Sequence, residues 1–130
     1  MTTAEIQIRD PFIFPESKEG VYFPTYVTDG PFLFRSRNGI LQMLWSSSGN
    51  NGCAMGVARS ESGAVTGPSR QEAEPLRAED GGHGMIFRGF DGRLFLTFHA
   101  PNNTPNERAV IVEVEDSDTG IQISEKAPKQ

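Results

Sequence analysis

The chain has 130 residues, 36% of them hydrophobic, and a formal net charge of −5. This length suits one domain that buries its own core, and the apolar fraction argues against a disordered chain. The basic residues are scattered along the sequence, which excludes a phosphate-binding stripe and argues against nucleic acid as a partner.

Cysteine content and hydropathy exclude further classes of protein. The single Cys53 cannot form an internal disulfide, and no Cys/His cluster has the spacing of a zinc site. We interpret Cys53 as a small buried residue. No apolar run approaches the ~18 residues of a membrane helix, and "MTTAEIQIRD" lacks the apolar centre of a signal peptide. We therefore expect a soluble, cytoplasmic protein with no membrane partner.

Short apolar runs separated by Gly, Asn and Ser turns predict strands along most of the chain. Valines and glutamates alternate over residues 110–115, which is typical of a half-buried strand. The segment with the best helical pattern, residues 69–80, is interrupted by Pro75. In chain order, the predicted strands are "PFIF", "GVYFPTYV", "PFLFRS", "ILQMLWSSS", "AMGVARS", "GMIFR", "RLFLTFHA", "AVIVEVE" and "GIQIS".

One pattern occurs three times along the sequence. Each copy is a polar residue, a short apolar strand, a charged or glycine-containing turn and a longer apolar strand. The copies begin at Asp10, Asp29 and His83. The pairs Asn38-Gly39 and Asp91-Gly92 supply the positive φ angles that tight hairpin turns require. The repeat predicts antiparallel units of similar structure.

These units predict an all-β fold made of β-propeller blades, about two and a half per chain. A two-sheet sandwich is the competing architecture, which the periodicity alone does not exclude. In a propeller the innermost strands line a channel, so Asp10, Asp29 and His83 would converge there. The single domain, residues 1–130, would consist of an orphan hairpin at 7–27, blades at 28–68 and 80–125, and a tail at 126–130.

The phrases "IRDPFIF", "DGPFLFRSRNGILQMLWSS", "GVARSESGAVTGP" and "GGHGMIFRGFDGRLFLTFHAPN" resemble the family 43 glycoside hydrolases. The resemblance covers roughly residues 7 to 115. It implies a five-bladed propeller that acts on arabinose- and xylose-containing plant polysaccharides. It also implies an inverting mechanism, in which a carboxylic acid protonates the glycosidic oxygen and a second carboxylate activates water. A third acidic residue would tune and orient the acid.

Carried over by motif, Asp10 of "RDPF" matches the general base. Asp29 of "TDGP" stands where many members have the Glu of "EGP", at the general-acid position. Its carboxyl would therefore stop ~1.5 Å short of a position built for Glu. His83 of "GHG" matches a histidine near the channel centre, where members often hold a calcium or another cation through water. Asp29 could alternatively bind substrate or cap its strand, and His83 could be a turn histidine.

Two further residues are candidates for substrate binding. His99, at the end of "RLFLTFHA", could reach the same rim as His83, although a structural role is the simpler interpretation. Trp45 in "MLWSS" could stack on a sugar ring, because an aromatic face suits the apolar face of a pyranose. Its place within an apolar strand also fits a core residue.

The chain is shorter than a five-bladed propeller, and "GVYFPTYV" runs directly into "TDGPFLF". A blade that would carry the third acid is therefore missing between them. One alternative function is a truncated, catalytically impaired relative that binds carbohydrate or has only a structural role. Another is a homodimer that closes one ring from two chains and covers the exposed edge strands.

Overall fold

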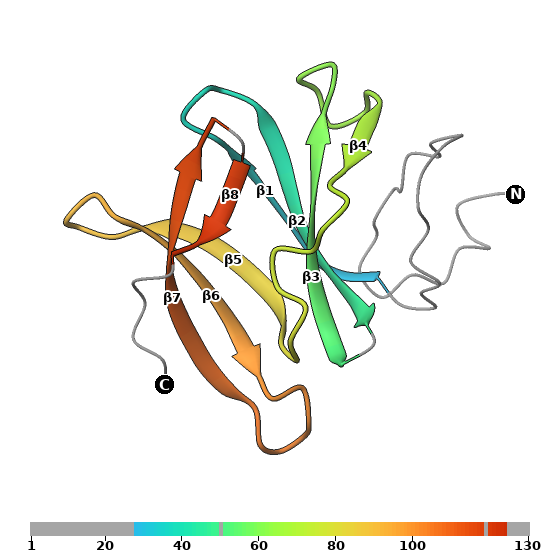
Figure 1. Ribbon diagram of the computed structural model, residues 1–130, viewed down its shortest axis with the longest axis vertical. Coiled ribbons are helices and arrows are strands. Elements are labelled where there is room, and N and C mark those ends of the chain that lie inside the picture. The colour runs from blue at the N-terminus through green and yellow to red at the C-terminus, as the bar shows by residue number, and fades with distance from the viewer. Residues whose placement is uncertain (1–27, 50, 119, 125–130) are drawn as a thin grey trace, which may run out of the picture.

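The computed structural model describes residues 28–49, 51–118 and 120–124. Over these residues the chain forms eight strands and no helix, in two antiparallel sheets of four strands each (Figure 1). The expectation of an all-β chain built from propeller blades is confirmed. The predicted hairpin at 7–27 and the tail at 126–130 lie outside the described residues, as does Asp10.

Each sheet runs up and down in strand order, which is the arrangement of a propeller blade. The two hairpin turns predicted from sequence are present, with positive φ angles of 78° at Gly39 and 85° at Gly92. The first blade contains β1 (Thr28–Arg35), β2 (Leu41–Gly49), β3 (Gly52–Ser60) and β4 (Ser69–Gln71). The second contains β5 (Gly82–Arg88), β6 (Leu94–Ala100), β7 (Arg108–Ser117) and β8 (Gly120–Ile123).

The segment with the best helical pattern forms an edge strand and an extended connection instead. Its first three residues are β4, which pairs with the end of β3. Farther along, Arg77 and Met55 exchange backbone hydrogen bonds of 2.9 and 3.2 Å. Pro75 lacks the N–H that a helix interior needs, whereas the edge of β3 offers partners to the backbone beyond it.

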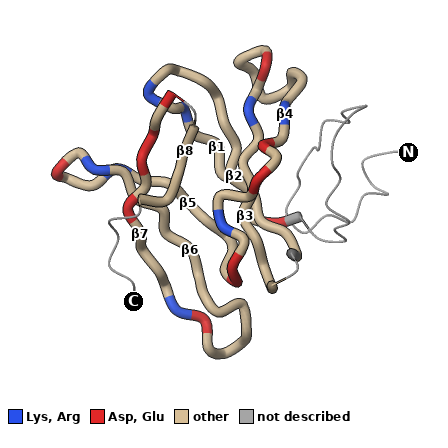
Figure 2. Tube along the Cα trace, viewed as in Figure 1, with Lys and Arg blue, Asp and Glu red and all other residues tan. Residues whose placement is uncertain are grey.

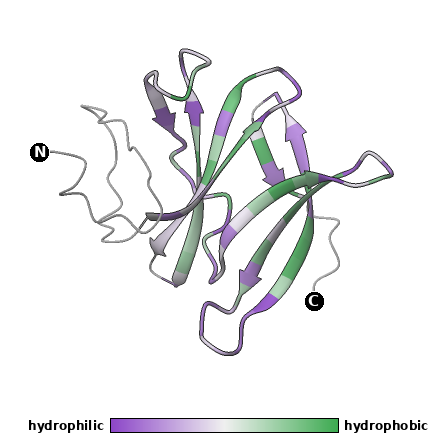
Figure 3. Ribbon diagram, turned by 180° about the vertical axis from the view of Figure 1, so that it is seen from behind, coloured by the Kyte–Doolittle hydropathy of each residue, from purple (hydrophilic) through white to green (hydrophobic). Residues whose placement is uncertain are grey.

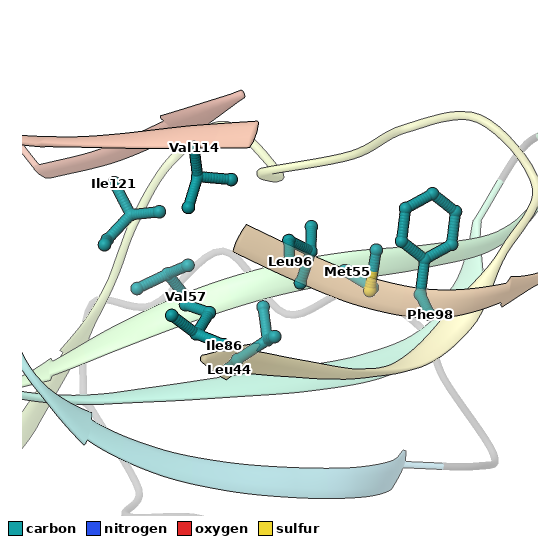
Figure 4. Packing of buried hydrophobic residues seen from close by; sticks show 8 residues of the cluster. All are labelled: Leu44, Met55, Val57, Ile86, Leu96, Phe98, Val114 and Ile121. Carbon is teal, nitrogen blue, oxygen red and sulfur yellow. The ribbon is translucent and has the colours of Figure 1, made fainter. Parts of the chain in front are cut away.

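The hydrophobic core lies between the two blades (Figure 4). Alternation along the strands gives each sheet one apolar face, and these faces meet. Leu44 and Met55 from the first blade and Leu96 from the second are fully buried. Figure 3 shows hydrophobic residues along the central strands and hydrophilic residues at the hairpin tips. Burial of each large apolar side chain contributes about 1.5–3 kcal/mol, so this interface fixes the angle between the blades.

The innermost strands, β1 and β5, lie next to each other across the blade boundary. Each has a register irregularity near its start, between Asp29 and Phe32 in β1 and between Gly82 and Met85 in β5. Gly30, which follows Asp29, and His83, which follows Gly82, both have left-handed backbone angles. Their φ values are 58° and 55°. The strand and turn positions of the two copies therefore match as predicted. Only the opening residue is offset by one, because His83 matches Gly30 rather than Asp29.

Charged residues lie mainly on turns and outer strands (Figure 2). At one end of the blade boundary, two hairpin turns are joined. Asp118 of the β7–β8 turn accepts hydrogen bonds from Arg37, at 3.1 Å, and from Asn38, at 2.9 Å. No part of the described chain forms a helix with the length and apolarity needed to cross a bilayer.

Candidate functional site

The centre of the candidate site is a pair formed by Asp29 of β1 and His83 of β5. The Oδ2 of Asp29 lies 3.5 Å from the Nδ1 of His83, an ion-pair distance when the imidazole is protonated. Both side chains remain accessible, with exposed fractions of 44% for Asp29 and 59% for His83. The predicted convergence of these two residues is thus observed. The pair offers a carboxyl group and an imidazole to a ligand at the mouth of the inner strands.

The backbone around the pair is held tightly on the side that faces the first blade. The His83 N–H donates to the hydroxyl of Ser46, at 2.8 Å, and Ser46 is only 2% exposed. A Cβ on Gly30 would lie 2.9 Å from the His83 Cα, so only glycine permits this approach. The Gly30 N–H donates to Asp29 Oδ1 at 2.7 Å and orients the carboxyl group.

The glycines that flank His83 also have a packing role. A Cβ on Gly84 would lie 2.6 Å from the Met55 sulfur and 2.9 Å from a methyl group of Leu44. Because β5 packs directly on these core residues, its backbone can hold no side chain there. The bare stretch around His83 therefore brings β5 against the first blade, with the imidazole beside Asp29 and Gly30 of β1.

A pocket of about 520 Å³ opens beside His83 on the second blade. Its floor is partly apolar, and its rim carries two histidines and a pair of opposite charges. The Nε2 of His99 donates to the side-chain oxygen of Asn102, at 2.8 Å. The lining residues are His83, Met85, Thr97, Phe98, His99, Glu107, Arg108 and Ala109. His83 and His99 thus share one cavity on the described surface.

Glu107 is the carboxylate of this pocket, and sequence reasoning missed it. A hydrogen bond from the hydroxyl of Thr104 is the main cause that lowers the pKa of Glu107. A proton donor to a glycosidic oxygen needs the opposite shift. Glu107 therefore suits a role as a fixed negative charge. It lies in the β6–β7 loop directly before β7, outside the repeated motif, so the repeat gave no signal for it.

The structure corrects the expectation of a sugar platform at Trp45. Its side chain is 3% exposed, and its indole N–H donates to the amide oxygen of Gln71 at 2.8 Å. A ring that is covered in this way cannot stack on a ligand. Trp45 is a core residue of the first blade, which was the alternative interpretation of its apolar strand.

A directly ligated cation does not fit the described residues. No three His, Cys, Asp or Glu side chains come together in the described ranges, and the Asp29–His83 pair supplies only two ligands. Structural metal sites use more protein ligands than this. The water-mediated cation expected at His83 remains a prediction.

No family model and no curated protein matches the sequence. An endo-arabinase from Bacteroides thetaiotaomicron is 46% identical, over 71% of this chain and 33% of that one, with a TM-score of 0.65. An endo-1,4-beta-xylanase from the same organism is 28% identical, over 78% of this chain and 38% of that one, with a TM-score of 0.66.

A thermostable family-43 glycoside hydrolase shares the fold, at 19% identity and a TM-score of 0.63 over 79% of this chain and 37% of that one. The chain spans about a third of the length of these solved proteins. Two blades with inner strands that meet at an Asp–His pair thus form part of a β-propeller of the glycoside hydrolase type. The chain is similar to family 43 of these enzymes, as its sequence motifs indicated.

Proposed function

We propose that the chain acts as a family 43-like glycoside hydrolase on arabinosyl or xylosyl linkages of plant polysaccharides, by an inverting acid/base mechanism. The likeness to an endo-arabinase at 46% identity favours arabinan over xylan. In this proposal Asp10 activates water and Asp29 protonates the leaving oxygen.

The observation that carries the proposal is the position of Asp29 at the start of the innermost strand, accessible and beside His83. An inverting enzyme needs two carboxyl groups about 6.5–9.5 Å apart on opposite faces of the sugar. Inner strands from different blades can supply such groups without proximity in sequence. The neighbouring imidazole can exchange a proton with the Asp29 carboxyl group between turnovers.

Three other described acids bind arginines. Asp91 and Glu113 bind Arg93, and Glu72 pairs with Arg59. Within the described ranges, Asp29 is thus the carboxyl group that stands on an innermost strand beside the pocket. This is the reason to assign it the acid position despite its shorter side chain.

The test is hydrolysis of linear arabinan, of xylan and of the corresponding aryl glycosides. We expect turnover on the arabinose substrates, with Asp10→Asn and Asp29→Asn each lowering kcat at least about 100-fold. Asp118→Asn is the matched control, because it also removes a carboxylate from the blade boundary but lies away from the pocket. An inert wild type, or equal activity in all variants, would remove the enzymatic proposal.

The second candidate function is carbohydrate binding without hydrolysis. It is favoured by the described acids, because in the part of the chain that the structure covers no second carboxylate stands on an innermost strand beside the Asp29–His83 pair. A binding protein would be retarded in a native gel that contains arabinan and would release no reducing sugar. If His83→Ala and His99→Ala both lost this retardation, the carbohydrate would bind at the pocket.

A further inference from the structure

Asp80 joins the two blades at the rim that carries the histidines. It ends the connection between the blades, three residues before His83. Its Oδ1 accepts the backbone N–H of Cys53, on β3 of the first blade, at 3.0 Å. Its Oδ2 accepts the backbone N–H of Asn102, in the β6–β7 loop of the second blade, at 2.8 Å. One carboxylate thus holds two loops that are far apart in sequence.

The second of these bonds leads directly to the pocket. The Asn102 residue whose backbone Asp80 binds also contacts His99, through its side-chain oxygen and the imidazole Nε2. With an amide oxygen as acceptor, Nε2 carries the proton and donates it. Nδ1 is then the ring atom that remains for a ligand. Asp80, Asn102 and His99 form a continuous series of hydrogen bonds from the blade boundary to the pocket.

The chain packs closely around the Asp80 carboxylate. A Cβ on Gly52 would lie 2.6 Å from Asp80 Oδ1, so the β2–β3 turn has been brought directly onto the carboxylate. On the opposite side, Arg77 donates to the Asp80 carbonyl at 3.2 Å and lies 4.7 Å above the ring of Phe98. Phe98 precedes His99 in β6, so the same connection also supports the strand that bears the imidazole.

We propose that Asp80 is a positioning residue, which orients the His99 imidazole in the pocket by fixing the backbone of Asn102. The side chain does not line the pocket, so it acts through its neighbours. An asparagine in its place has one carbonyl oxygen for two N–H donors, and its NH₂ group would face the other donor. The β6–β7 loop would then lose its fixed position while the core between the blades persists.

The experiment follows the histidine ring resonances by NMR in the full chain, which has only two histidines. We expect Asp80→Asn and Asn102→Ala both to shift the His99 ring signals. Asp80→Asn should also speed exchange of the Asn102 amide roughly two- to tenfold, the range of a net hydrogen bond. Asp118→Asn changes the contact of Asp118 with Arg37 and Asn38, which also joins the two blades. It should leave the His99 ring signals unchanged.

An unchanged His99 in Asp80→Asn, or an equal shift in Asp118→Asn, would overturn the proposal. If Asp80→Asn does not fold, Asp80→Glu replaces it, because this variant keeps the charge and displaces the carboxylate by one methylene. Asn102→Ala tests the hydrogen bond between Asn102 and His99. Because Asn102 is exposed, this change leaves the hydrophobic core intact.

A kinetic measurement extends the proposal to catalysis, and this part alone rests on the proposed function. With His99 as a substrate contact, Asp80→Asn should raise the KM for arabinan severalfold with kcat little changed. Equal losses in kcat and kcat/KM would contradict a positioning role. An inert wild type would refute the proposed function, whereas the NMR result would still decide the role of Asp80.

Discussion

Asp29 and His83 meet across the boundary between two blades, with 3.5 Å between the carboxylate Oδ2 and the imidazole Nδ1. The contact exists because two bulged strands start side by side and because Gly30 leaves room for the His83 backbone. The two groups lie within ion-pair distance when the imidazole is protonated. The pair couples the two blades at the point where the proposed chemistry occurs.

The φ of 55° at His83 gives a first prediction. A residue with a Cβ costs about 1–2 kcal/mol in this region, whereas glycine adopts it freely. His83→Gly and His83→Ala both remove the imidazole, yet we expect the glycine variant to be more stable by about 1 kcal/mol. Urea unfolding measures the difference in free energy. Equal stabilities would contradict the left-handed backbone at this position.

The close contact of Gly84 gives a second prediction. In Gly84→Ala the new Cβ would overlap the Met55 sulfur and Leu44, so we expect a loss of about 1–3 kcal/mol from overpacking. Met55→Ala opens space at the same place. In the double variant the added cost of Gly84→Ala should therefore fall, which a double-mutant cycle measures. Strict additivity would mean that Met55 does not define the contact.

Much of the fold followed from the sequence, because the strands are short, locally patterned and joined by turns with characteristic residues. The opening residue of the copy at His83 was nevertheless misplaced by one position, because a bulge is set by pairing between strands and leaves little trace in hydropathy. The sequence did not decide whether Trp45 is buried, for a similar reason. Alternating hydropathy predicts a strand, but it does not say which residues cover each face of the strand.

The site was less accessible to sequence reasoning than the fold. Asp29, His83 and His99 were found because they stand at strand ends in a repeated motif. Asp80 was not, because its importance rests on two backbone N–H groups from distant loops, which no local pattern reports. The one signal in the sequence was that Asp80 stands immediately before "GGHG", where the connection between the blades ends and an innermost strand begins.

Acid should weaken the contact between the two hairpin turns in which Asp118 accepts hydrogen bonds from Arg37 and Asn38. Hydrogen bonds from Asn38 and Arg37 lower the pKa of Asp118 below its ordinary value of 3.8. Because the folded-state pKa is the lower one, the contribution of Asp118 is present above about pH 4 and is lost as the pH falls through that depressed value. Between pH 6 and pH 3, the Tm of the wild type should therefore fall more than that of Asp118→Asn. Parallel declines would show that the clamp adds nothing to stability in solution.

The outer face of the second blade leads to the last prediction. Met85 and Ile111 are 46% and 55% exposed, and both pair with Thr97, so they form one row across β5, β6 and β7. In a closed propeller each blade is covered on both faces. Because Met85 and Thr97 also line the pocket, we propose that a second copy of the chain covers the Ile111 end of this row, beside the pocket.

Light scattering on an eluting size-exclusion peak tests this association directly. We expect twice the chain mass of 14.3 kDa for the wild type and a single-chain mass for Ile111→Lys, which places a charge in the middle of the row. Glu115→Lys, on the same strand but at an exposed polar position, should keep the double mass. A wild type that elutes as one chain would exclude the dimer. The proposed activity would then require the Asp29–His83 pair to work in an open arrangement of blades, and carbohydrate binding without hydrolysis would become the better-supported function.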